Sequence, residues 1–252
     1  MFRAEDSRQA RPAPWRGILL VLLALSAVLT VLSFVLPYSS DHPIVAEGTG
    51  SLYFLLDVVL DFNLPTWWSA SLLVIAAAGH LVAAWVALPR SRATAAAWVG
   101  LGLLTALMSL DDTIRIHERL DRLTNRVLDP SDYPFTWVLL GIPIAIGILV
   151  AAVVLGRALP RRTRNAILVG LGTFFFAAVG IEVLGGWLLH TTGVSTIYRI
   201  SYHIEEFLEM AGAAVLVVAP LIGVQTSPER DVWTLPAAQT QALGAENSSP
   251  RR

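Results

Sequence analysis

The chain has 252 residues, of which 55% are hydrophobic and 15% are charged, and it carries a formal net charge of −1. A composition of this kind, concentrated in long apolar segments, is typical of integral membrane proteins and excludes an ordinary soluble domain. The sequence contains no cysteine, which excludes disulfides, thiolate metal sites and cysteine nucleophiles.

Six apolar segments follow one another along the chain, and each is long enough to cross a hydrocarbon core of ~30 Å at ~1.5 Å per residue. We expect an all-α bundle of six transmembrane helices, at about residues 17–36, 65–88, 94–120, 135–155, 165–189 and 200–224. The first segment is long for a signal-peptide core and no A-x-A site follows it, so we interpret it as an anchored span. Residues 1–16 and 225–252 are polar, and we expect them to be disordered cytoplasmic tails.

The segment between the first two spans is acidic and contains no arginine. Within it, residues 51–62 predict a short amphipathic helix that lies on the membrane surface. Asp57 and Asp61 fall on one face of that helix at i,i+4 spacing, which is typical of a solvated face. Trp67 and Trp68 follow at the start of the second span, where an interfacial aromatic belt is expected.

The distribution of arginine predicts the orientation of the chain. All 18 basic residues are arginine. If the N-terminus is cytoplasmic, thirteen of them fall in cytoplasmic segments, and the outer segments hold the other five, Arg115, Arg119, Arg122, Arg126 and Arg199. The positive-inside rule therefore favours six spans with both termini cytoplasmic.

Three polar insertions interrupt the apolar spans at a similar expected depth. They are SLDDTIRIHERL at residues 109–120, a lone Glu182 in the fifth span, and HIEEFLEM at residues 203–210 in the sixth. At ~1.5 Å per residue, all three fall in the outer half of the bilayer. Ionisable groups within a span avoid lipid, so each insertion should face the bundle interior. The sequence therefore predicts a shared polar cavity.

Several carboxylates in such a cavity must be protonated, paired with arginine or bridged by a cation. No arginine is placed to pair with Glu182, Glu206 or Glu209, the deepest of the acids. We therefore predict one or two bound divalent metal ions, with Fe, Mn or Zn as the ions that carboxylate and imidazole ligands suit. The predicted ligands are Asp111, His117, Glu118, Glu182, His203, Glu206 and Glu209.

Other classes of function remain open at this point. The same carboxylates could serve a proton or cation carrier, or a buried ion-pair network in a structural or partner-binding membrane protein. If the protein is an enzyme, the natural reaction uses a metal-activated water or oxygen species on a lipophilic substrate, which would make it a metal-dependent oxidoreductase or hydrolase. Membrane lipids are the expected partners, and no protein partner or oligomeric state follows from the sequence.

Several further residues have more ordinary interpretations. Asp112, Asp121 and Glu205, taken singly, favour interfacial ion pairs, and His80 favours a packing role. Ser109 has no G-x-S-x-G context that would make it a nucleophile. No basic face suggests a nucleic-acid partner, and no G-x-G-x-x-G follows a strand, so we expect no nucleotide cofactor.

Four passages in combination resemble a widespread family of uncharacterised bacterial and archaeal multi-pass membrane proteins. They are NLPTWWS at 63–69, SLDDTIRIHE at 109–118, GIEVLGG at 180–186 and EEFLEMAG at 205–212. The family pattern has Asp-Glu where this chain has Asp111-Asp112. The resemblance implies a shared architecture and supplies no reaction. It draws attention to Asp111, His117, Glu118, Glu182, Glu206 and Glu209. Separately, we expect the protein to lie in a bacterial cytoplasmic (inner) membrane.

Overall fold

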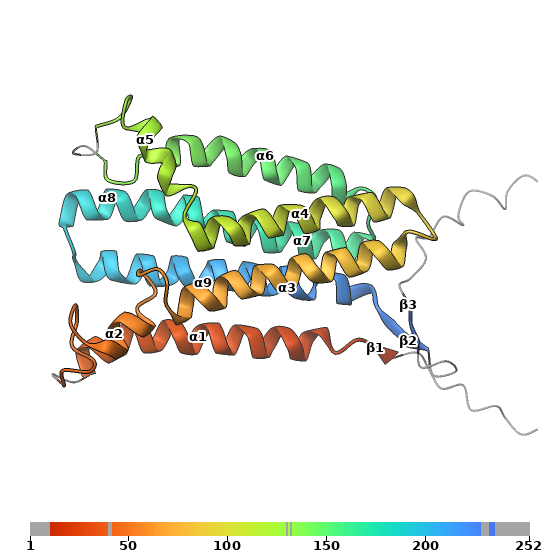
Figure 1. Cartoon of the computed structure of the whole chain (residues 1–252), viewed down its shortest axis with the longest axis horizontal. Coiled ribbons are helices and arrows are strands. Elements are labelled where there is room, and N and C mark those ends of the chain that lie inside the picture. The colour runs from red at the N-terminus through yellow and green to blue at the C-terminus, as the bar shows by residue number, and fades with distance from the viewer. Residues whose placement is uncertain (1–10, 40–41, 130, 132, 228–231, 235–252) are drawn as a thin grey trace, which may run out of the picture.

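A computed structural model describes residues 11–39, 42–129, 131, 133–227 and 232–234, and these form an elongated helical bundle (Figure 1). The described part of the chain contains six helical segments long and apolar enough to cross a membrane, which confirms the expected helical bundle. Five are α1 (Trp15–Ser39), α3 (Leu64–Ala87), α4 (Arg92–Ile114), α6 (Val138–Gly156) and α9 (Thr196–Val218). The other joins α7 (Arg161–Phe175), the π-helical η2 (Phe176–Ile181) and α8 (Glu182–Thr192).

The remaining elements are short. They are α2 (Ser51–Leu56), η1 (Glu118–Leu120), α5 (Asp121–Thr124), η3 (Ala219–Gly223) and the strands β1 (Arg11–Pro12), β2 (Gln225–Ser227) and β3 (Val232–Thr234). The strands pair antiparallel in the order β1-β2-β3. This small sheet joins two segments that we expected to be disordered tails. The rest of the two predicted tails, residues 1–10, 228–231 and 235–252, lies outside the described residues.

Side-chain caps start three of the spans at places that the sequence marks clearly. Asn63, Ser91 and Ser195 each accept a hydrogen bond from a backbone N–H three residues further on, at 3.2, 3.2 and 3.4 Å. Such caps satisfy donors that the first turn of a helix leaves unpaired. The caps therefore fix where α3, α4 and α9 begin.

The third span ends at Ile114, short of the end expected at residue 120. Arg115 takes a left-handed conformation with φ of 55°, and its N–H donates to the carbonyl of Asp111 at 2.7 Å. The Asp111 carboxylate then accepts the backbone N–H of His117 at 2.8 Å. The helix stops because this turn takes the hydrogen bonds that a further helical turn would need.

The surface helix predicted at residues 51–62 is also shorter than expected, since α2 ends at Leu56. Asp57 follows in an extended conformation and is only 7% exposed. Phe62 has a φ of 59°, which turns the chain into α3. Neither Asp57 nor Asp61 therefore lies on a helical face, and Asp61 forms an ion pair with Arg115.

The packed core lies between α3, α4, α7 and α9. Leu72, Leu101, Leu171 and Leu216 are at most 1% exposed. Small residues let the helices approach closely, above all at Gly212, where an added Cβ would lie 2.6 Å from the carbonyl oxygen of Gly170. α1 packs on α9 and α3, whereas α6 packs on α7 and α4.

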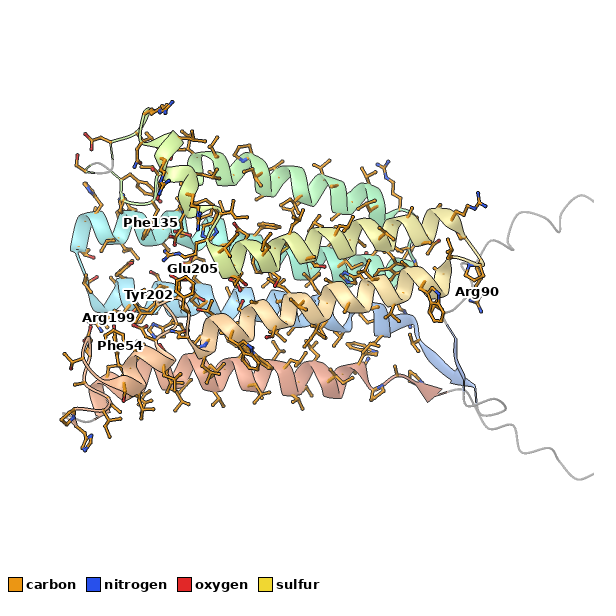
Figure 2. All side chains as sticks on the ribbon, in the orientation of Figure 1. Phe54, Arg90, Phe135, Arg199, Tyr202 and Glu205 are labelled. Atoms are coloured by element: carbon orange, nitrogen blue, oxygen red, sulfur yellow. The ribbon has the colours of Figure 1, made fainter. Side chains whose placement is uncertain are left out.

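The two ends of the bundle differ. One end holds α2, α5 and the α8–α9 turn, and we call it the chamber end (Figure 1). The opposite end, which we call the arginine end, holds the α3–α4 turn, the α6–α7 turn and the small sheet. Phe135, Arg199 and Glu205 lie toward the chamber end and Arg90 lies at the arginine end (Figure 2). The acids that the sequence singled out lie toward the chamber end.

Candidate functional site

A cavity of about 500 Å³ lies between α4, α6 and the α7–η2–α8 span, and we call it the chamber. Most of its wall is apolar, including Leu103, Leu104, Leu107, Ile144, Ile148, Phe174, Phe175, Ala178 and Val179. The polar side chains that line it are those of Asp111, Asp112, His117, Trp137, Glu182 and Glu209. On α4 and α6 the polar residues come at the chamber end and the apolar residues deeper in the bundle. The chamber is therefore an apolar space with a polar end.

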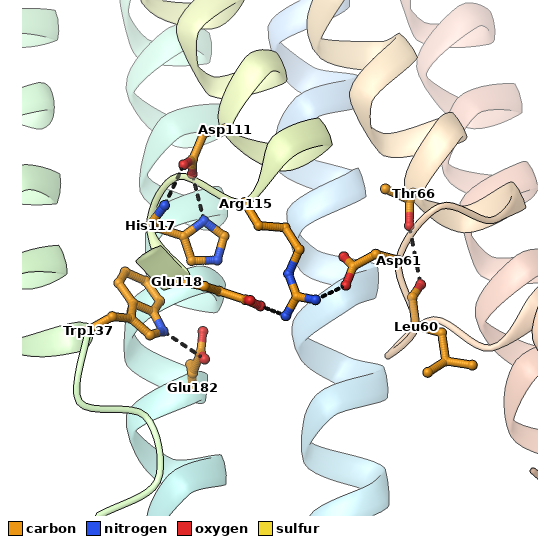
Figure 3. A network of polar contacts seen from close by, with 9 residues as sticks. All are labelled: Leu60, Asp61, Thr66, Asp111, Arg115, His117, Glu118, Trp137 and Glu182. Atoms are coloured by element: carbon orange, nitrogen blue, oxygen red, sulfur yellow. Dashed lines mark hydrogen bonds and ion pairs between the residues drawn. The ribbon is translucent and has the colours of Figure 1, made fainter. Parts of the chain in front are cut away.

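Asp111 and His117 form the central pair of this polar end (Figure 3). One carboxylate oxygen of Asp111 accepts the backbone N–H of His117, and the other lies 2.8 Å from Nδ1 of the same residue. A carboxylate accepts, so Nδ1 carries the proton of this bond. Nε2 is then the ring nitrogen left for the chamber, and no hydrogen bond of the described residues reaches it. The pair is an imidazole oriented by a carboxylate.

The pKa of His117 is raised above its ordinary value, although burial acts to lower it. The hydrogen bond to Asp111 and the negative charges of Asp111, Glu182 and Asp112 outweigh that burial. Tyr133 donates a hydrogen bond to the carbonyl of Val183 at 3.0 Å, and its pKa is raised as well. Burial and the carboxylates of Glu182 and Glu205 raise the pKa of Tyr133 to about 12. The chamber end therefore holds an excess of negative charge.

Arg115 compensates two other acids at this end. Its guanidinium forms ion pairs with Asp61 and with Glu118, as Figure 3 shows. Arg115 lies four residues after Asp111, a spacing that would favour an ion pair in a continuous helix, but the left-handed turn at Arg115 carries its side chain toward Asp61 in the loop before α3. Arg115 and Glu118 do not line the chamber.

Trp137 connects Glu182 to the Asp111–His117 pair. Its indole N–H donates to Glu182 Oε1 at 3.0 Å, and its ring lies 4.7 Å from the ring of His117 between centroids. The indole sits against Gly141, one turn further along α6, where any Cβ would overlap it. Sequence reasoning did not single out Trp137. The available signal was an indole donor at the expected depth of an acid that lacked a partner.

Glu182 owes its position partly to the π-helical η2 that precedes it. A π segment contains wider turns than an α-helix, so it rotates the residues after it relative to those before it. Ala178 and Val179 of η2 line the chamber together with Glu182. Such segments are frequent at functional sites.

His203 lies in a separate hydrogen-bonded chain that joins α1, α9 and the loop after α2. Its Nδ1 donates to the carbonyl of Arg199 at 2.8 Å, so its Nε2 accepts from the Ser33 hydroxyl at 3.0 Å. The Ser33 oxygen in turn accepts the backbone N–H of Val58 at 3.0 Å. Both ring nitrogens of His203 are engaged, and the residue does not line the chamber.

The acids of α9 lie close to those of the other helices. Glu205 lies near Glu182, so the two carboxyl groups repel each other when both are charged. Glu209 lines the chamber and Glu206 does not. Within the described part of the chain, no ion pair with arginine reaches Glu182 or the acids of α9. Asp112, for which we expected an interfacial ion pair, lines the chamber.

The structure thus gathers four of the seven predicted ligands, Asp111, His117, Glu182 and Glu209, around one cavity. Among the described residues, no three carboxylate or imidazole side chains are grouped so that they could hold a metal ion. Several donors are instead bonded to organic partners. The metal centre stays a prediction.

The family model described as "Domain of unknown function (DUF8692)" matches residues 18–224. The match covers nearly all of the six spans, the chamber and the acids of α9. No curated protein and no solved structure matches the chain significantly. Since the family model spans most of its length, this chain belongs to the DUF8692 family, a domain of unknown function.

Proposed function

We propose that this protein is a multi-pass protein of a bacterial cytoplasmic membrane, with both termini in the cytoplasm and the chamber end toward the outer face. The arginine distribution supports this orientation, because thirteen of 18 arginines then fall in cytoplasmic segments. A reporter enzyme active on only one side of the membrane, fused after β3, would report the cytoplasmic side. Activity on the outer side would overturn the orientation.

We propose further that the chamber binds a lipophilic molecule and that the polar end exchanges a proton with the molecule's polar group. The observation that carries this proposal is an apolar cavity of about 500 Å³ that ends at an oriented imidazole. This volume is within the range of small-molecule sites, which are mostly apolar with a few placed polar groups. The chamber is long enough for an alkyl chain, since α4 rises roughly 16 Å between Gly100 and Asp111, which both line it.

The proton exchange follows from the geometry of the pair. Asp111 binds Nδ1–H, so Nε2 of His117 accepts a proton from the bound polar group and later returns it. The imidazolium formed in between is stabilised by the Asp111 carboxylate, in agreement with the raised pKa of His117. The Trp137 ring packs against the imidazole, and its indole N–H donates to Glu182.

The metal centre is a second candidate function, because five oxygen and nitrogen donors line the same chamber: Asp111, Asp112, His117, Glu182 and Glu209. His117 could ligate a metal ion there through Nε2 while Asp111 keeps its bond to Nδ1–H. Elemental analysis of purified protein tests it, with Glu182→Gln as the comparison. Stoichiometric metal that is lost in the variant would support the centre, and metal-free protein from metal-replete cells would exclude it.

A substitution that fills the chamber with a larger side chain tests the proposed lipophile binding. Ala178 lines the chamber on η2, whereas Ala106 is exposed on α4 and does not line it. We expect native mass spectrometry of detergent-purified protein to show a retained lipophile in the wild type and in Ala106→Phe, and to show its loss in Ala178→Phe. Equal retention in both variants would place the bound molecule outside the chamber and overturn the proposal.

A further inference from the structure

The charges that face the chamber define what kind of polar group its occupant carries. Asp111 and His117 compensate each other, and the guanidinium of Arg115 is held by Asp61 and Glu118 outside the lining. The other ionisable groups that line the chamber are all acids, Asp112, Glu182 and Glu209. The lining therefore offers acceptors and negative charge, and no arginine for an anion.

Among these acids, Asp112 gives the clearest indication of the chemistry of the chamber's occupant. Its Oδ2 is buried and forms no hydrogen bond of standard length and angle, although the Ser69 hydroxyl lies near the carboxylate. A buried carboxylate oxygen left in this way is destabilising unless it takes a proton or meets a cation. Because the residue lines the chamber, a bound molecule can supply both the positive charge and the N–H donor.

The apolar wall of the chamber favours an organic cation over an inorganic one. A wall of leucine, isoleucine and phenylalanine side chains offers nothing to a hydrated inorganic ion along most of the length. An ammonium group at the end of an apolar chain fits both parts, with the chain against the wall and the head among the acids. A phosphate or carboxylate head would meet like charges.

We propose that the occupant of the chamber is a single-chain lipophile with a protonated amine head, which donates to Asp112 and lies near Glu209. This inference rests on the proposed function, because it names the substrate class of the same site.

Three matched probes test the head group: laurylamine, lauryl alcohol and lauric acid, which share one alkyl chain. Each is added at equal concentration and neutral pH to detergent-purified protein, and retention is measured by native mass spectrometry. We expect wild type to retain laurylamine at least ~10-fold better than lauric acid, as one charge-assisted hydrogen bond suffices for such a ratio. Asp112→Asn should reduce laurylamine retention by about the same factor. Asp129→Asn, which removes an exposed carboxylate outside the chamber, should not.

The outcomes separate this inference from the proposed function. If Ala178→Phe lowers retention of none of the three chains, the chamber binds no lipophile and both proposals fall. If lauryl alcohol or lauric acid is retained as well as laurylamine, the amine inference is wrong and the proposed function stands. If laurylamine is preferred equally in wild type and Asp112→Asn, the role of Asp112 is wrong. Should Asp112→Asn not fold, Glu209→Gln provides the same comparison on α9.

Discussion

The core around α3, α4, α7 and α9 is closely packed, whereas the chamber beside α6 is an open cavity. In the most apolar windows of α1 and α6, only 11% and 22% of the residues are buried inside the protein. The corresponding shares are 44% for α3 and α4 and 50% for α9. The least apolar spans, α4 and α9, are thus among the best buried. In a membrane the apolar face turns to lipid and the polar groups turn inward.

Side-chain size also separates the two regions. The buried core between the helices is rich in alanine and glycine, which lets backbones approach closely, as at Gly170 and Gly212. The chamber is walled by larger side chains that leave a cavity of about 500 Å³ between them. The close packing of the core indicates a structural scaffold, and the open cavity of the chamber indicates the binding site. The predictions below test this division.

The largest effect should follow a methyl group added to the core. In Gly212→Ala the new Cβ would lie 2.6 Å from the Gly170 carbonyl oxygen and 2.8 Å from the Phe174 backbone nitrogen. Backbone cannot move aside cheaply, so we expect at least ~3 kcal/mol of destabilisation, or loss of folded protein. Thermal unfolding in detergent measures it.

Gly172→Ala is the matched control on the same helix as Gly170. Nothing lies within 4 Å of its added Cβ, and alanine is the better helix former. Unfolding should occur at an unchanged or slightly higher temperature. Equal destabilisation by the two variants would contradict the close α7–α9 contact.

A methyl group added beside the chamber should have a smaller and different effect. In Gly141→Ala the Cβ would overlap the Trp137 ring, so the indole must move and its bond to Glu182 is lost. We expect about 1–3 kcal/mol of destabilisation, together with weaker retention of the chamber's occupant. Gly147→Ala, also on α6, has open space around its Cβ and should change neither. Unchanged retention in Gly141→Ala would show that Trp137 does not shape the site.

Hydropathy was sufficient to place the spans, because apolar composition is a local signal. The ends of α4 and α2 were missed because they depend on single residues, Arg115 and Phe62, that adopt left-handed conformations in tertiary context. In a helix continued to residue 120, Asp111 and His117 would lie six residues apart, roughly 9 Å along the axis, whereas the turn at Arg115 brings them into direct contact.

The candidate site was predicted in part for similar reasons. Expected depth correctly grouped Asp111, His117, Glu182 and Glu209, since depth follows from counting residues along a helix. It could not reveal that His203 bonds to Ser33 on α1, because that contact depends on how the helices pack. The rotation that η2 introduces before Glu182 has no sequence signature that we recognised.

Loss of the Ser33 hydroxyl tests the contact between α1 and α9, which lies outside the chamber. Ser33→Ala would leave Nε2 of His203 and the backbone N–H of Val58 without partners in a buried place. We expect ~1–2 kcal/mol of destabilisation, with retention of the chamber's occupant unchanged. Thr30→Ala on the same helix removes only a bond to the carbonyl of Ser26 and should be nearly neutral. If Ser33→Ala reduced retention instead, His203 would belong to the site.

The smallest effect should be the pH dependence that the Asp111–His117 pair adds to stability. The pKa of His117 is raised in the folded protein, so the pair's contribution is fully present below the ordinary histidine pKa of about 6.5 and is lost as pH rises through the folded value. The two side chains are 31% and 37% exposed, so solvent screening should hold the contribution to at most ~1 kcal/mol. The difference in unfolding free energy between wild type and His117→Gln, measured at several pH values, isolates the contribution of the pair. The control, His190→Gln at the exposed end of α8, should keep the pH dependence of wild type. A difference that grows with pH would mean that Asp111 holds a neutral imidazole, and the proton exchange assigned to Nε2 would then lose its support.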